Sequence, residues 1–286
     1  MGSRRRAVLT LAQPERREAS TTSDLTPRDP ESAAALAHLY DLDLTEDPGD
    51  VDLYLALAGR TGGPVLELAA GSGRLAVPLA RAGYRITGVD IDPAMLDRAR
   101  TAAALAGAEV AGRMTWVEAD LVGLRLPDAG RFRLAFIGLN SILALGSRRA
   151  QREALRTMAA HLEPGGLAVV DAWQPDAEDL ARFDGRLILE WGRLDAATGD
   201  QITKIGSAQH DAATQTVRLT TLYEAGPPGE RPRRWLRVDT MRLVSADELA
   251  GFAEDAGLEV ELVAGGYGLE PLAPGSDRAI LLAVRP

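Results

Sequence analysis

Residues 65–90 read VLELAAGSGRLAVPLARAGYRITGVD. The apolar run 65–68 predicts a short buried strand, residues 73–82 a helix and residues 86–89 a second strand, which together form a βαβ unit. The turn between the first strand and the helix carries Gly71, Gly73 and Ala76, and Asp90 follows about 20 residues after the first strand. This pattern is typical of a dinucleotide-binding loop, but by itself it does not decide between NAD and another ligand that contains adenosine.

Strands and helices continue to alternate after this unit. Asp92 and Pro93 predict a helix start, with the aspartate as N-cap and the proline in the first turn. Residues 114–117, 133–138 and 167–171 are expected strands, and 148–162 is an expected helix. This order predicts a doubly wound sheet with helices on both faces.

The pattern changes after Trp173. Residues 187–194, 202–210, 216–223 and 235–244 are expected strands joined by polar turns, which suits an antiparallel sheet. A capping box at Ser245 and Glu248 then predicts another helix, ended by Gly257, and two strands follow at 259–263 and 278–284.

Four regions follow from this pattern. Residues 1–30 lack apolar periodicity and are expected to be a disordered leader. Two helices, within 31–44 and 50–60, are expected to precede the core, so that 31–180 forms a cofactor-binding core. Residues 181–244 form an antiparallel β lid, and 245–286 complete the core sheet.

The composition and charge of the chain exclude several classes of partner and binding site. The chain has 286 residues, a formal net charge of -9, no cysteine and three widely separated histidines. The acidic balance argues against a nucleic-acid partner, and the missing cysteines and histidine pairs argue against a metal site. No apolar run is long enough to span a membrane, so the cytoplasm is the expected location.

Three acidic residues are expected at one end of three successive strands: Glu67, Asp90 and Asp120. A buried carboxylate such as Glu67 needs a charged or hydrogen-bonding partner. A pyrophosphate would repel it, whereas a ligand with an ammonium and a sulfonium group would attract it, which favours S-adenosylmethionine over NAD. Asp90 can accept the ribose hydroxyls of either ligand. Asp120 can accept from an adenine amino group or serve only as a turn residue.

The segments VLELAAGSGR, GVDIDPAML, WVEADL, FRLAFIGLNSI and HLEPGGLAVV, in this order, resemble class I S-adenosylmethionine-dependent methyltransferases. The similarity covers residues 38–286. Within the family, the chain resembles the small-molecule branch, which includes glycine/sarcosine and nucleotide-sugar N-methyltransferases. Ala69 and Ala70 replace the commoner Gly-Cys pair, and Arg133 replaces a usual aspartate. The resemblance implies a Rossmann-like doubly wound sheet, mostly parallel with an antiparallel last strand, plus the inserted lid. The cofactor contacts that it implies are Tyr40, Tyr54, Glu67, Ala69, Gly71, Gly73, Asp90, Ile91, Met95, Asp120, Leu121 and Leu139.

The acceptor is expected near residues 138–141, where Gly-Leu-Asn-Ser differs from the Asn/Asp-Pro-Pro-aromatic motif of enzymes that methylate nucleic-acid bases. This favours a small-molecule acceptor, methylated on nitrogen or oxygen. Asn140 is a candidate for orienting it, or a turn residue. Trp191, Tyr223 and Trp235 can wall a pocket, although aromatic residues in strands more often pack in a core.

Two alternatives stay open at this point. An NAD(P)-dependent oxidoreductase of the short-chain type needs a Tyr-x-x-x-Lys pair, but Lys204 is the only lysine and no tyrosine lies four residues before it. A non-catalytic ligand-sensing protein on the same fold is the second alternative. The pattern does not distinguish a monomer from a homodimer.

Overall fold

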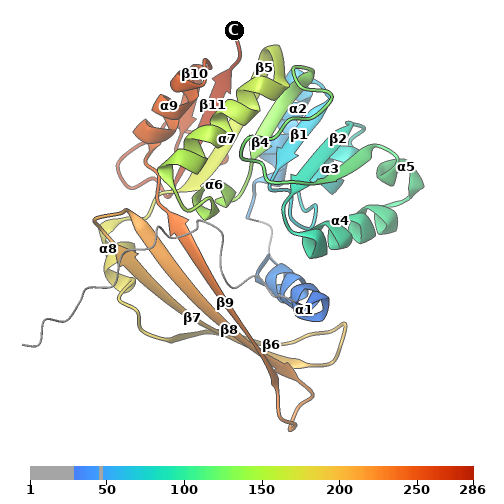
Figure 1. The fold of residues 1–286 in the computed structure, drawn as a ribbon, viewed down its shortest axis with the longest axis vertical. Coiled ribbons are helices and arrows are strands. Elements are labelled where there is room, and N and C mark those ends of the chain that lie inside the picture. Colours follow the sequence, from blue (N-terminus) through green and yellow to red (C-terminus); the bar gives the residue numbers. More distant parts are fainter. Residues whose placement is uncertain (1–28, 45–47) are drawn as a thin grey trace, which may run out of the picture.

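A seven-stranded sheet forms the centre of the protein, in the order β10-β11-β5-β4-β1-β2-β3 (Figure 1). The computed structural model describes residues 29–44 and 48–286. All neighbouring strands are parallel except β11, which runs antiparallel to both β5 and β10. The strands are β1 Val65–Leu68, β2 Ile86–Asp90, β3 Met114–Glu118, β4 Phe132–Ile137, β5 Leu162–Trp173, β10 Glu259–Ala264 and β11 Arg278–Val284. The expected mostly parallel sheet with an antiparallel last strand is confirmed.

Helices cover both faces of this sheet because its central strands are apolar on both faces. In β4, Leu134 and Phe136 pack against one helical layer, and Ala135 and Ile137 pack against the other. The first layer contains α2 Val51–Thr61, α3 Ala76–Arg81, α4 Pro93–Ala106 and α5 Ala108–Ala111. The second contains α6 Ser141–Ala144, α7 Arg148–His161 and α9 Ala246–Asp255. This places the carboxyl ends of the parallel strands at one open edge of the core.

The βαβ unit of residues 65–90 forms with one correction. The helix α3 begins at Ala76, three residues later than expected, because Gly71 and Gly73 have positive φ angles of 54° and 82° that belong to the turn. The next helix, α4, begins as expected: the Asp92 side chain accepts from the Ala94 N–H at 2.9 Å and Pro93 follows the cap. The sequence therefore predicted the start of α4 correctly and the start of α3 three residues too early.

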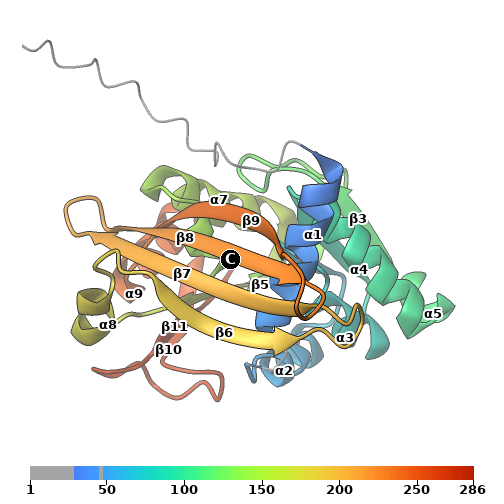
Figure 2. The same ribbon diagram turned by 90° about the horizontal axis from the view of Figure 1, so that it is seen from below.

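The second sheet contains four antiparallel strands in the order β6-β7-β8-β9, as the sequence predicts. Its strands are β6 Ile188–Leu194, β7 Gln201–Asp211, β8 Thr216–Gly226 and β9 Arg233–Arg242. An unpredicted helix, α8 Ala177–Arg182, precedes it and starts with a capping box between Asp176 and Asp179. Figures 1 and 2 show this sheet as a layer outside the core, beyond the open edge.

The first helix, α1 Pro30–Asp41, lies between the core and the second sheet and continues into a 3-10 turn, η1 Leu42–Leu44. Leu36 and Leu39 of α1 pack with Ile202, Tyr223 and Ala225 of the second sheet. On another side α1 lies against α4 (Figure 2). The two expected N-terminal helices are thus present as α1 and α2, while residues 1–28 of the expected disordered leader lie outside the described residues.

The cap of α9 is another correction. The Ser245 hydroxyl accepts from the Glu248 N–H, as a capping box requires, but the Glu248 carboxylate pairs with Arg242 at 2.8 Å and with Arg148 at 3.2 Å. An ion pair thereby replaces the reciprocal half of the box. In the described ranges, no helix combines the length and apolarity needed to cross a membrane.

Candidate functional site

The parallel arrangement of β1, β2 and β3 brings Glu67, Asp90 and Asp120 to the same open edge, as the sequence predicts. Glu67 lies near the carboxyl end of β1, Asp90 ends β2, and Asp120 follows β3. The turn of residues 69–75, called here the glycine turn, connects β1 to α3 beside the first two acids. The three carboxylates nevertheless have very different surroundings.

Glu67 is a buried acid with one unsatisfied oxygen. Its exposed fraction is 4%, and its Oε2 atom has no hydrogen-bond partner among the described residues. The nearby Arg74 does not satisfy it, because the Arg74 guanidinium forms a bidentate pair with the buried Asp50 at 2.6 and 2.7 Å. Burial raises the pKa of Glu67 to about 8, and Arg74 offsets this effect only in part. A carboxyl group in this state favours a cationic partner.

Asp90 is held in place by the backbone on both sides. The N–H of Gly71 donates to its Oδ2 atom at 2.7 Å, and the N–H of Asp92 donates to its Oδ1 atom at 2.9 Å. Burial raises the pKa of Asp90 against the effect of these two donors. Because each carboxylate oxygen has two lone pairs, both oxygens retain capacity for a further donor such as a ribose hydroxyl.

Asp120 is exposed and forms a turn. Its Oδ1 atom accepts from the Val122 N–H at 2.8 Å, which is the local contact that aspartate makes in turns. The apolar residues that follow Asp90 and Asp120 differ in exposure. Ile91 is 59% exposed, whereas Leu121 is buried in the core. An exposed isoleucine next to Asp90 provides an apolar surface at this edge.

A cavity of about 50 Å³ lies between the glycine turn and the end of β4. Six of the residues expected to contact a cofactor line it: Tyr40, Glu67, Ala69, Gly71, Met95 and Leu139. Gly138 and Ser141, from the segment expected near the acceptor, line the same cavity. The structure thus brings together residues from α1, β1, α4 and the β4–α6 connection.

Two expected contacts are explained by packing within the protein. Tyr54 is fully buried, with its ring 4.3 Å from that of Phe136, and its hydroxyl has no partner among the described residues. A Cβ atom on Gly73 would lie 2.9 Å from the Trp116 ring, so a glycine is needed there for the close approach of the turn to β3. Tyr54 therefore lies in the core next to Gly138 of the cavity wall, and the space for a side chain at Gly73 is filled by Trp116.

Asn140 has the turn-forming role that the sequence left open. It adopts a positive φ of 67°, and its Oδ1 atom accepts from the Trp173 N–H at 2.7 Å and from Arg278 at 2.9 Å. Its carbonyl oxygen is thereby used to fasten the β4–α6 connection to β5. The neighbouring Leu139 N–H donates to Asp171, a buried acid at the end of β5.

Sequence reasoning missed this Asp171 cluster. Arg278 pairs with Asp171 at 2.6 Å, and the Tyr267 hydroxyl donates to Asp171 at 3.1 Å. Burial raises the pKa of Asp171, and Arg278 opposes that effect. The available signal was an apolar strand ending in aspartate, but the partner arginine lies 107 residues later in the chain.

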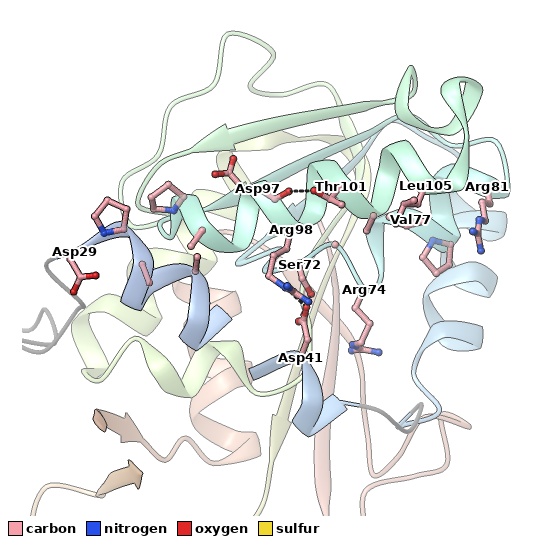
Figure 3. A pocket seen from close by; sticks show the side chains of 18 residues that line it. Asp29, Asp41, Ser72, Arg74, Val77, Arg81, Asp97, Arg98, Thr101 and Leu105 are labelled. Carbon is pink, nitrogen blue, oxygen red and sulfur yellow. Dashed lines mark hydrogen bonds and ion pairs between the residues drawn. The ribbon is translucent and has the colours of Figure 1, made fainter. Parts of the chain in front are cut away.

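A second missed contact set fastens the end of α1 over the glycine turn. The Ser72 hydroxyl donates to Asp41 at 2.8 Å, and Arg98 of α4 pairs with the same carboxylate at 2.5 Å. Figure 3 shows Ser72 and Arg98 converging on Asp41 at the wall of a cavity of about 920 Å³ between α1, α3 and α4. This larger cavity lies on the outer side of the glycine turn, away from Glu67.

The second sheet contacts α1 and η1 through a polar cluster around Asp43. Asp43 accepts from Trp191 at 2.8 Å, Lys204 at 2.8 Å and Tyr223 at 2.9 Å, and Lys204 also pairs with Glu190 at 2.8 Å. The three aromatic residues named from the sequence, Trp191, Tyr223 and Trp235, pack in the small core between the second sheet and α1. They follow the expectation that aromatic residues in strands are more often core.

Residues 65–166 match the family model described as a methyltransferase domain. This segment of the chain is therefore similar to methyltransferase domains, and the surrounding fold is of the class I type. An uncharacterized protein of Mycobacterium tuberculosis is 35% identical over 129 residues, which are 45% of this chain and 42% of that relative, so the alignment spans well under half of its length.

Two longer similarities extend beyond the methyltransferase domain. A cypemycin N-terminal methyltransferase from Streptomyces is 28% identical over 244 residues, covering 82% of this chain and 87% of that protein. The solved structure of an amino pentose methyltransferase from Micromonospora echinaspora, with S-adenosylmethionine bound, has a TM-score of 0.63 and 19% identity and covers 88% of this chain and 97% of that one.

These findings confirm several sequence predictions. The family match confirms the expected methyltransferase class for residues 65–166, and one of the solved neighbours has S-adenosylmethionine bound. The structural likeness confirms the Rossmann-like fold. The methyltransferase match also argues against the oxidoreductase.

Proposed function

We propose that the chain transfers the methyl group of S-adenosylmethionine to a nitrogen atom of a small molecule. The observation that carries this proposal is the buried Glu67 carboxyl, whose Oε2 atom lacks a partner at the wall of the cavity beside the glycine turn. The methionine ammonium of the cofactor would supply the missing cationic partner. A pyrophosphate, in contrast, would add a second negative charge to this wall.

The remaining residues at this edge fit the rest of the cofactor. Asp90, already oriented by the N–H groups of Gly71 and Asp92, would accept the ribose hydroxyls. The exposed side chain of Ile91 would cover one face of adenine, and the second oxygen of Asp120 would accept from the adenine amino group. Met95 and Tyr40, at the cavity wall, would lie near the methionine part, where a tyrosine face favours a sulfonium.

For this reaction the protein mainly has to orient the two reactants and exclude water from the site. When bound, S-adenosylmethionine supplies a methyl group on a sulfonium that is already a reactive donor. A neutral amine attacks it without a strong base, whereas a hydroxyl needs one to remove its proton. Among the described residues that line the Glu67 cavity there is no histidine. This absence favours nitrogen as the acceptor atom.

None of the three histidines is among the residues that line this cavity. His38 pairs with Asp195 at 2.7 Å. His161 is buried between the Thr157 carbonyl and the Leu126 N–H. His210 lies in β7 of the second sheet.

We further propose that residues 181–244 act as a lid over the acceptor. Such a lid would exclude water and help to align the reacting atoms, and alignment contributes roughly 7–11 kcal/mol in favourable cases.

Thermal shift measurements test the cofactor assignment. S-adenosylhomocysteine should raise the melting temperature and NADH should not, and Asp90→Ala should abolish the response. Asp97→Ala, which removes an exposed acid of α4 paired only with Arg100, is the matched control and should respond like the wild type. An equal response to NADH, or none to S-adenosylhomocysteine, would overturn the assignment.

Methyl transfer to matched amines and alcohols tests the acceptor atom. A screen with labelled S-adenosylmethionine against amino sugars, their hydroxyl analogues and amino acids should label the amines only. Transfer to the hydroxyl analogues at a comparable rate would refute nitrogen as the acceptor while leaving the cofactor assignment intact.

A further inference from the structure

Arg237 of β9 differs from the other described cations around the Glu67 cavity. Arg74 is bound by Asp50, Arg98 by Asp41, Arg278 by Asp171 and Lys204 by both Asp43 and Glu190. Arg237 donates only through Nε, to Asp239 at 2.6 Å. Its two terminal nitrogens make no hydrogen bond to any residue in the described ranges, and its side chain is 42% exposed.

The position of Arg237 connects it with the cavity. Its guanidinium lies 5.8 Å from the centre of the Tyr40 ring, and Tyr40 lines the cavity together with Glu67 and Gly138. Arg237 of the second sheet therefore adjoins a residue of the cavity wall. A group bound by its terminal nitrogens would lie between the second sheet and the open edge of the core.

The strands beside Arg237 carry small residues opposite it. Thr221 of β8 is directly opposite Arg237 in the register, and Gly206 of β7 is directly opposite Thr221. Directly opposite residues share one face of a sheet, so the Thr221 hydroxyl lies next to Arg237 and Gly206 lies one strand further away. The Glu190 side chain lies across Gly206, where a Cβ atom would approach it to 1.8 Å.

We propose that Arg237 binds an oxyanion of the methyl acceptor, a phosphate or a carboxylate, through its two terminal nitrogens. A guanidinium presents paired N–H donors that match either group. The bond to Asp239 leaves this edge available and fixes the plane of the guanidinium. This inference rests on the proposed function, because it assigns the same site an acceptor with both an amine and an acidic group.

Anion titration tests the proposal. The protein is titrated calorimetrically with inorganic pyrophosphate and, separately, with glutarate, at constant ionic strength, with and without saturating S-adenosylhomocysteine. We expect the wild type to bind at least one of the two anions in the millimolar range. Arg237→Gln should weaken that binding by about tenfold or more, since the anion loses the paired N–H donors of the guanidinium.

Two variants control for other effects. Arg234→Gln removes a more exposed arginine of the same strand, which pairs with Glu224, and should bind the anion within twofold of the wild type. Arg237→Lys keeps the charge but not the paired donors and should recover part of the lost affinity. The melting temperature of each variant, measured in parallel, identifies a loss caused by misfolding.

The outcomes separate the possible partners of Arg237. Binding of pyrophosphate alone indicates a phosphate-bearing acceptor, and binding of glutarate alone indicates a carboxylate. The proposal is overturned if the wild type binds neither anion, or if Arg237→Gln binds them equally well. It is also overturned if Arg237→Gln loses affinity for S-adenosylhomocysteine, because the cofactor's own carboxylate is then the partner. A wild type that binds the anions but not S-adenosylhomocysteine would refute the proposed function instead.

Discussion

Replacing Glu67 with glutamine should make the protein more stable, and increasingly so as the pH rises. The pKa of the folded-state carboxyl is raised by burial to about 8, from an ordinary value of 4.5. Below pH 4.5 this carboxyl is protonated in both states and costs nothing. Between these two values the unfolded chain releases the proton while the folded protein keeps it, so rising pH favours unfolding. Glutamine has nearly the same shape and does not titrate.

The size of the effect follows from the same interval. Each pH unit between 4.5 and about 8 lowers the free energy of unfolding by roughly 1.4 kcal/mol, which amounts to about 5 kcal/mol above pH 8. Between pH 5 and pH 8 the difference in unfolding free energy between Glu67→Gln and the wild type should therefore grow by about 3–4 kcal/mol. Urea denaturation at intervals of one pH unit measures it.

Comparing the two proteins at each pH removes the contributions of other titrating groups. Glu118→Gln, exposed in β3 at the edge of the same sheet, controls for the loss of one negative charge. A difference that stays constant to within about 1 kcal/mol from pH 5 to pH 8 would refute the reasoning, because the Glu67 carboxyl would then be ionised in the folded protein.

The same pKa sets the proton balance of cofactor binding. If the methionine ammonium pairs with Glu67, binding of S-adenosylhomocysteine at pH 7 should release close to one proton, because the carboxyl must ionise. Calorimetry in buffers of different ionisation enthalpy measures this number. Glu67→Gln should release none, and equal release by both proteins would place the ammonium elsewhere.

Two further predictions concern packing. Gly73→Ala should destabilise the fold by about 2–4 kcal/mol in urea denaturation, because its Cβ would approach Trp116 to 2.9 Å in a backbone with positive φ, whereas Gly83→Ala, which shares the positive φ but meets nothing within 4 Å, should cost only about 1 kcal/mol. Asp43→Asn should lower the free energy of unfolding by about 1–3 kcal/mol, because it weakens bonds to a half-buried lysine and a tyrosine, and no change would show that the cluster is not stabilising.

The sequence predicted those features that depend on neighbours along the chain. The βαβ unit, the cap at Asp92 and the position of acids at strand ends follow from local periodicity and strand direction. Gly73 shows where this approach reaches its limit. The motif attributes this glycine to ligand approach, but its nearest obstacle is the Trp116 ring, which only the paired strands bring close. The three-residue delay of α3 has the same origin in the turn geometry.

Pairings between distant residues could not be predicted, because no local pattern encodes them. Arg74 and Asp50 are 24 residues apart, and Arg278 and Asp171 are 107 apart. Asp50 stood at the start of an expected helix and Asp171 at the end of an expected strand, with no local sign of a partner arginine. Their pairing has a chemical consequence, however: it occupies the arginine nearest to Glu67 and leaves that carboxyl available for a ligand.

The short segment of residues 40–43 connects the two halves of the proposed site. Tyr40 faces the cavity, Asp41 holds the glycine turn and α4, and Asp43 holds the second sheet. In a helix, successive side chains point about 100° apart, so one turn can contact three different elements. Because Arg237 of the second sheet also lies over Tyr40, a cofactor that packs against Tyr40 would contact the same residue that adjoins the proposed acceptor anion. The two ligands of the proposed site should therefore meet at this segment, which a search for a single apolar helix face does not identify.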